Sequence, residues 1–189
     1  MTPKLHWLRT LFLVLARKRR VPHGAAPFGY TKGTMAFPVA IVVASLVELG
    51  VVHVLVPWTW LQILLLVLTI WGMLFVLGPF ASRAVHPHLV TSEALELRWG
   101  QRSVLSTPLT NLRSVEPLLD HAPTQPAADG TRLILTQFQS TNVRIVFVEP
   151  VASSPPVPRR HLPPGFRAAE AALYVDDPAA FIAACGGGG

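Results

Sequence analysis

The chain has 189 residues, enough for one compact soluble domain and a membrane anchor but not for two large domains. Only 14% of the residues are charged, against roughly 25% in ordinary globular proteins, and residues 36–80 contain one formal charge, Glu48. The net charge of +6 originates in residues 1–34, which have seven basic and no acidic side chains; this argues against nucleic-acid binding, which typically uses a basic folded domain.

The basic N-terminal segment covers residues 1–35. Its apolar stretch, residues 5–16, is 12 residues long and therefore too short to cross a bilayer. It predicts either an interfacial helix or a tail whose charges only fix orientation. A signal peptide is disfavoured because a basic cluster follows instead of a small-residue cleavage site. That cluster is expected to lie at the membrane surface against anionic headgroups; it consists of Arg17, Lys18, Arg19 and Arg20.

Residues 36–80 predict a transmembrane hairpin made of two apolar segments, 36–56 and 58–77. Each is about 30 Å long as a helix, which suffices to cross the hydrocarbon core. Pro57 alone separates them, and it is expected to end the first helix and open the second, so that the two run antiparallel. Basic residues lie on both flanks and none in the turn. The positive-inside rule therefore predicts a two-span protein of the cell membrane with its N-terminus and C-terminal domain in the cytoplasm.

A polar seam is expected inside the hairpin. Glu48 lies near the middle of the first segment, where an acidic side chain is costly. Thr69 lies at a similar depth in the second segment and shares a helix face with Gln62. The favoured interpretation is a neutral Glu48 that forms a hydrogen bond across the hairpin. Contact with a partner helix and a proton or ion relay remain alternatives, so all three residues are candidate binding residues.

Residues 81–185 predict a mainly β domain, because apolar residues now alternate with polar ones. This period of two marks antiparallel strands with one face on a core. It is clearest at Leu95, Leu97 and Trp99, and again at Val143, Ile145 and Phe147. Residues 111–118, 132–138 and 169–175 are further expected strands. The sequence thus predicts six or seven short strands in a small barrel or bent sandwich.

Local signals supply the remaining elements. Asp129 and Gly130 predict a turn, and the proline-rich residues 149–164 predict a surface loop. Asp176 and Asp177 followed by Pro178 predict the start of a helix that stops at Gly186. Residues 186–189 form a glycine tail.

Several short motifs, in this order, resemble uncharacterised bacterial integral membrane proteins in which a two-helix transmembrane hairpin precedes a pleckstrin-homology-like (PH-like) domain. The resemblance runs over residues 25 to 185 and implies a barrel of about seven strands closed by a C-terminal helix. It implies no activity. The motifs are His86 to Thr91 (HPHLVT), Ala94 to Gly100 (ALELRWG), Thr107 to Leu109 (TPL), Thr141 to Arg144 (TNVR), Glu149 to Val151 (EPV), and Val175 to Pro178 (VDDP) with Phe181.

The sequence contains no catalytic constellation, nucleotide-binding loop or metal-ligand spacing, so no catalytic residue, metal or cofactor is expected. His86 and His88 lack an evident third ligand, and Cys185 is the sole cysteine. The leading hypothesis is a non-enzymatic, membrane-anchored interaction or scaffold module with a protein partner. The alternative is a lipid- or small-ligand-binding protein, or an accessory subunit of a transporter or cell-envelope enzyme that uses Glu48.

Overall fold

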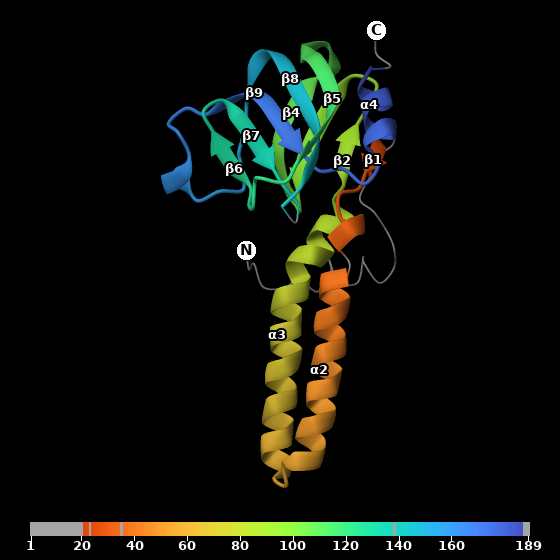
Figure 1. Cartoon of the computed structure of the whole chain (residues 1–189), viewed down its shortest axis with the longest axis vertical. Coiled ribbons are helices and arrows are strands. Elements are labelled where there is room, and N and C mark those ends of the chain that lie inside the picture. Colours follow the sequence, from red (N-terminus) through yellow and green to blue (C-terminus); the bar gives the residue numbers. More distant parts are fainter. Residues whose placement is uncertain (1–20, 23, 35, 138, 187–189) are drawn as a thin grey trace.

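In the computed structural model, a pair of long helices projects from a β domain (Figure 1). The structure describes residues 21–22, 24–34, 36–137 and 139–186. The predicted basic cluster Arg17, Lys18, Arg19 and Arg20, and the apolar stretch 5–16, lie outside the described residues.

The two long helices are α2 (Ala36–Leu55) and α3 (Thr59–Val85). Each contains an 18-residue window of high mean hydropathy, 2.3 in the first and 2.4 in the second, and neither window is buried in the protein interior. The core helix of a soluble protein would be buried at such a window. By length and composition, both helices are therefore able to cross a membrane.

Helix α3 differs from its predicted bounds at both ends. Pro57 does not open it, because the chain turns through residues 56–58 and Trp58 is the N-cap. The helix then continues past Leu77 to Val85, since Ala81 and Val85 are buried against the β domain. Pro79 lies within this extension, where it cannot donate a backbone hydrogen bond to the preceding turn. The last turns of α3 bend toward the β domain (Figure 1).

The hairpin is inserted between two paired strands of one antiparallel sheet. This sheet has the order β1-β2-β3-β4, formed by β1 (Ala26–Phe28), β2 (His88–Val90), β3 (Ala94–Trp99) and β4 (Arg102–Pro108). Strand β1 precedes the hairpin and pairs with β2, which follows it, in the register Phe28↔His88. Residues 26–28 thus belong to the β domain, although the sequence analysis assigned them to the N-terminal segment. A short 3-10 helix, η1 (Lys32–Thr34), leads into α2.

The second sheet has the order β5-β8-β9-β7-β6. It is formed by β5 (Leu112–Asp120), β6 (Ala127–Asp129), β7 (Arg132–Leu135), β8 (Thr141–Ala152) and β9 (Arg167–Leu173), and the 3-10 helix η2 (Leu109–Asn111) leads into it. The predicted all-antiparallel pairing is wrong at one place, because β7 and β9 are parallel. Strand β9 lies between β8 and β7, runs antiparallel to β8 and parallel to β7, so β7 and β8 run in opposite directions on its two sides.

The two sheets lie next to each other along two edges. Along one edge they form hydrogen bonds with each other, and along the other edge helix α4 (Pro178–Gly186) packs between them. In the described residues, Leu105 of β4 and Ser153 form an isolated β-bridge, and the N–H of Ser154 donates to the carbonyl of Val104 at 2.7 Å. On the opposite side, Phe181 packs edge-on against Phe28 of β1 with ring centroids 5.2 Å apart. The expected closed barrel of about seven strands is therefore not what the described residues form; they form nine strands in two separate sheets.

The C-terminal helix α4 (Pro178–Gly186) begins where the sequence predicts. Asp177 is its N-cap, since the carboxylate accepts a hydrogen bond from the N–H of Ala180 at 3.0 Å. Phe181 and Cys185 of α4 are buried in the shared core with apolar residues of both sheets.

The predicted loop at residues 149–164 starts later than expected, because β8 continues to Ala152. The loop contains the 3-10 helix η3 (Arg159–His161).

Candidate functional site

The hairpin meets the four-stranded sheet in a cluster that we call the junction, defined by Tyr30, Arg83, His88, Trp99 and Gly100. Tyr30 comes from the segment between β1 and η1, and Arg83 from the last turn of α3. The other three belong to β2, the end of β3 and the turn that follows β3. The junction therefore joins both ends of the hairpin to the same sheet.

Tyr30 is at the centre of the junction and is 1% exposed. Its ring stacks on His88 with centroids 4.6 Å apart and on Trp99 with centroids 6.0 Å apart. Its hydroxyl accepts a hydrogen bond from the N–H of Gly100 at 2.8 Å. Burial raises the pKa of Tyr30 to about 12, although the Gly100 hydrogen bond and the nearby Arg83 and Arg98 charges act in the other direction. The hydroxyl is therefore neutral at any physiological pH.

Arg83 connects α3 to two other parts of the chain and also lies near Phe80 of its own helix. Its guanidinium carbon lies 4.4 Å from the ring centroid of Trp99 and 5.9 Å from that of Phe80. Its Nη1 donates to the side-chain carbonyl of Gln137, in the loop after β7, at 3.4 Å. A cation in the last turn of a helix is also stabilised by the exposed carbonyls there. Arg83 thus fixes the end of α3 against β3 and the β7–β8 loop.

Gly100 allows α3 to approach the sheet closely. It has φ of +57°, a conformation that a side chain strains, and an added Cβ would lie 2.9 Å from the hydroxyl oxygen of Ser82. Both its conformation and the proximity of α3 therefore require glycine at this position.

His86 and His88, which the sequence offered without a third metal ligand, both form hydrogen bonds. His88 is 1% exposed, and its Nδ1 accepts a hydrogen bond from the N–H of Arg98 at 3.0 Å. Burial, together with the Arg98 charge, lowers the pKa of His88 to about 3, so this ring is neutral. His86 donates from Nδ1 to the carbonyl of Ser82 at 2.8 Å, at the C-terminus of α3. In the described part of the chain, no three His, Cys, Asp or Glu side chains are grouped to hold a metal.

A polar cavity of about 550 Å³ lies beside the junction. Its charged groups are Arg98 and Glu96, which form an ion pair at 2.8 Å. Burial raises the pKa of Glu96, but hydrogen bonds from Arg98 and Ser103 and the Arg98 charge together lower it by more. The cavity is lined by Val21, Pro22, His86, Glu96, Arg98, Gln101 and Ser103. Its cation and anion neutralise each other.

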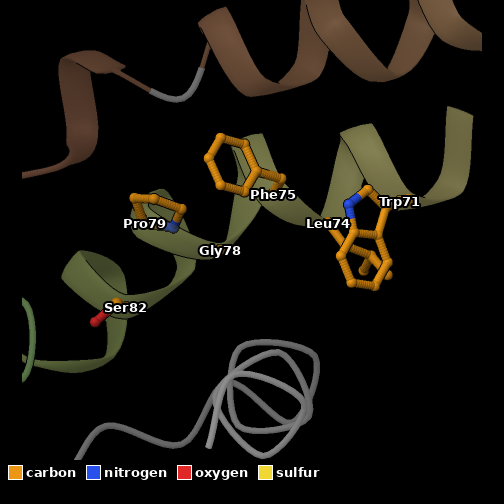
Figure 2. Close-up of a pocket in the computed structure, with 6 residues that line it drawn as sticks. All are labelled: Trp71, Leu74, Phe75, Gly78, Pro79 and Ser82. Carbon is orange, nitrogen blue, oxygen red and sulfur yellow. The ribbon is translucent and has the colours of Figure 1, made fainter. Parts of the chain in front are cut away.

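An apolar groove of about 380 Å³ runs along α3 below the junction (Figure 2). Figure 2 shows the rings of Trp71 and Phe75 projecting from the helix, with Pro79 and Ser82 further along it. The lining residues are Trp71, Leu74, Phe75, Gly78, Pro79 and Ser82. A groove of this chemistry suits a hydrocarbon chain better than a polar ligand.

The three residues of the predicted polar seam are placed differently from one another. Gln62 donates from Nε2 to the carbonyls of Val56 at 2.7 Å and His53 at 3.2 Å, so it caps the C-terminus of α2 from α3. Thr69 is half-buried, whereas Glu48 is exposed on α2. Within the described residues, no hydrogen bond joins Glu48 to Thr69. A binding role for Glu48 stays a prediction.

The sequence does not predict the junction. In the sequence, Arg83 is only one of the basic residues that flank the hairpin, and Gly100 is only the last residue of the ALELRWG motif. Tyr30 lies in the segment assigned outside the domain, and its contacts are separated from it by the whole hairpin. The available signal was an aromatic residue beside one end of the hairpin and an arginine at the other.

Comparison with known proteins finds no matching family model, no matching curated protein and no matching solved structure.

Proposed function

We propose that this chain is a membrane-anchored, non-enzymatic interaction module whose β domain is held in a fixed orientation at the cytoplasmic surface. The observation that carries this proposal is the junction. Both ends of the hairpin enter one sheet, and Tyr30 and Arg83 lock them against Trp99. A domain tethered through one flexible linker could turn freely; two connections and a shared aromatic cluster prevent that.

The membrane placement is supported by the hydrogen bonds and the exposed tryptophans at the turn of the hairpin. Unpaired backbone carbonyls are costly in lipid, and Gln62 provides a donor to two carbonyls near the end of α2. Trp58 and Trp60, at this turn, are 59% and 66% exposed, as in an aromatic belt at a membrane surface. The basic residues Lys32 and Arg83 lie at the opposite end of the hairpin, beside the β domain. The positive-inside rule then favours a cytoplasmic domain.

We further propose that the β domain is PH-like, as the sequence resemblance implies. Support comes from the order of its elements, in which two mainly antiparallel sheets are followed by a C-terminal helix packed between them. Helix α4 fills the seam beside β1, where the strands do not pair. This proposal concerns the fold and assigns no ligand.

The β domain, rather than the hairpin, is proposed to contact the protein partner. Three charged residues of the five-stranded sheet are already paired, since Glu170 bonds to Arg144 at 2.8 Å and to Arg132 at 3.0 Å. The outer strands of the two sheets offer backbone groups for strand addition, and β5 is the longest of them. Leu119, at the end of β5, is 72% exposed.

Two experiments test the proposal. A topology reporter fused after Gly189 should give a cytoplasmic signal, and an extracytoplasmic signal would overturn the orientation. Crosslinking with mass spectrometry in native membranes should then place partner contacts on residues 88–185. Crosslinks confined to residues 36–85, or turnover of a substrate or an ion gradient by the purified chain alone, would contradict an interaction module.

A lipid-binding role is the second candidate, and the apolar groove of Figure 2 favours it. A photoactivatable phospholipid should label Trp71 or Phe75 in preference to Trp60, which is also exposed but lies at the far end of α3. Equal labelling of all three would indicate contact with bulk lipid only. An accessory role in transport remains tied to Glu48 and requires that Glu48→Gln and Glu48→Leu alter the associated activity.

A further inference from the structure

Glu48 lies on the outer face of the hairpin. It is exposed on α2, whereas Ser45 and Leu49 on the neighbouring face are half-buried toward α3. Along α2, Glu48 is about 10 Å from the helix end at Leu55. If the hairpin crosses a membrane, as the proposed function holds, this carboxyl group faces hydrocarbon.

A carboxyl group in that position needs a partner outside its own hairpin. The apolar part of α3, residues 59–82, has no charged side chain. Gln62 is engaged with the carbonyls of Val56 and His53, and the side chain of Glu48 forms no hydrogen bond with another described residue. Ionisable side chains in membrane helices are rare and almost always paired or directed into a protein interior. An exposed and unpaired Glu48 therefore marks a contact surface.

The surroundings of Glu48 suit close helix packing. Ala44 precedes it by one turn and Ala40 by two, on the same side of the helix, and both are exposed. Val51, one turn further on, is 49% exposed. Small residues let two backbones approach, which brings a short polar side chain within hydrogen-bond reach of its counterpart.

We infer that this face of α2 binds the same face of a second copy of the chain, with the two Glu48 carboxyl groups hydrogen-bonded to each other. A neutral carboxyl group both donates and accepts, so it is complementary to itself. A twofold dimer presents each residue to its own copy near the axis. A helix of another protein would need a polar group at the depth of Glu48. A second copy of this chain already has one, because its own Glu48 lies at the same depth.

The test uses the full chain in lipid nanodiscs, in a Cys185→Ala background that removes the native thiol. Ala44→Cys places a thiol on the proposed interface, and Ser45→Cys places one on the adjacent, half-buried face as a matched control. Under oxidation, Ala44→Cys should form disulfide-linked dimers about tenfold more readily than Ser45→Cys. Equal crosslinking of the two variants, or none with Ala44→Cys, would overturn the inference.

Two further variants test Glu48 itself in the Ala44→Cys background. Glu48→Gln keeps a donor and an acceptor and should retain crosslinking, whereas Glu48→Leu should reduce it about tenfold. Unchanged crosslinking with Glu48→Leu would contradict the carboxyl pair. Thermal unfolding of the β domain should be the same in all variants, which separates loss of association from loss of folding. Crosslinks in native membranes that join Ala44→Cys to a different protein in place of a second copy would also overturn the inference.

Because this inference rests on the proposed membrane placement, vesicle flotation is measured on the same samples. A chain that floats with vesicles but does not crosslink refutes the dimer and leaves the interaction module standing. A chain that fails to float refutes both.

Discussion

The hydroxyl of Tyr30 accepts a hydrogen bond from the backbone N–H of Gly100 at 2.8 Å, although 70 positions separate the two residues. The whole helical hairpin lies between them in the sequence. This bond therefore closes the sheet around the base of the hairpin, and it makes the stability of the β domain sensitive to residues on both sides of the hairpin.

Tyr30→Phe should destabilise the chain by about 1–3 kcal/mol, because it leaves the buried Gly100 N–H without an acceptor. Chemical denaturation of the full chain in detergent micelles, followed by circular dichroism, measures the change. Tyr174→Phe is the matched control, since the half-buried Tyr174 hydroxyl makes no hydrogen bond within the described residues. Equal effects of the two substitutions would contradict the role of the hydrogen bond.

Acid should destabilise the β domain through His88. Burial holds the pKa of His88 at about 3 in the folded protein, against an ordinary value of 6.5, so the unfolded chain binds a proton first as the pH falls. The contribution of this neutral ring is fully present above pH 6.5 and is lost progressively toward pH 3. His88→Gln can still accept from Arg98 and should flatten the loss of stability between pH 6.5 and 5. An unchanged pH profile in that variant would show that other groups control it.

Gly100→Ala should cost more stability than Gly130→Ala. Both glycines have φ of +57°, but the Cβ at position 100 would meet Ser82 at 2.9 Å, whereas position 130 has open space around it. The shared conformational cost is about 1 kcal/mol, and the crowding should add about 1–3 kcal/mol at Gly100. Ser82→Ala combined with Gly100→Ala should recover part of the added loss. No recovery would mean that the backbone conformation alone accounts for it.

Arg83 and Trp99 should show energetic coupling. A double-mutant cycle with Arg83→Met and Trp99→Leu should give an interaction free energy of about 1–2 kcal/mol, because a partly buried guanidinium lies over the indole face. The same cycle with Arg113→Met, at an exposed position of β5, should be additive. Additivity in both cycles would show that the contact between Arg83 and Trp99 does not help to hold α3 against the sheet.

A soluble form of the β domain should require the segment before the hairpin. Joining residues 24–34 through a short Gly/Ser linker to residues 80–186 retains β1, Tyr30 and the packed end of α3. This protein should unfold cooperatively, whereas residues 80–186 alone should be less stable by several kcal/mol, since they lack a strand and a buried aromatic side chain. Equal stability of the two would show that β1 is dispensable.

The sequence predicted the elements whose signals are local. Apolar runs of 20 residues gave the hairpin, alternation gave β3 and β8, and Asp177 with Pro178 gave the start of α4. Strand β1 was not predicted because three residues are too few to show alternation and its partner β2 is 60 residues away. The parallel pairing of β7 with β9 was not predicted either, because it depends on β9 lying between β8 and β7, and the order of strands in a sheet is not a local property of the sequence.

The junction was out of reach for a different reason. Its contacts join residues far apart in the sequence, and each residue has an ordinary local explanation: a turn for Gly100, a flanking charge for Arg83. Only their meeting around Tyr30 gives them a shared role. Glu48 and Thr69 were expected to lie at a similar depth because they are similar numbers of residues from the turn. That spacing determines the position of a residue along the helix axis, but not the direction in which its side chain points.

The insertion of the hairpin between β1 and β2 also sets an order of assembly during synthesis. Strand β1 leaves the ribosome before the hairpin, and its partner β2 leaves after it. Closing a flexible loop of about 60 residues would cost about 3–4 kcal/mol, but a formed hairpin already brings its two ends together. The completed sheet is thus a late product of hairpin formation, and until the hairpin has formed β1 is without its partner β2.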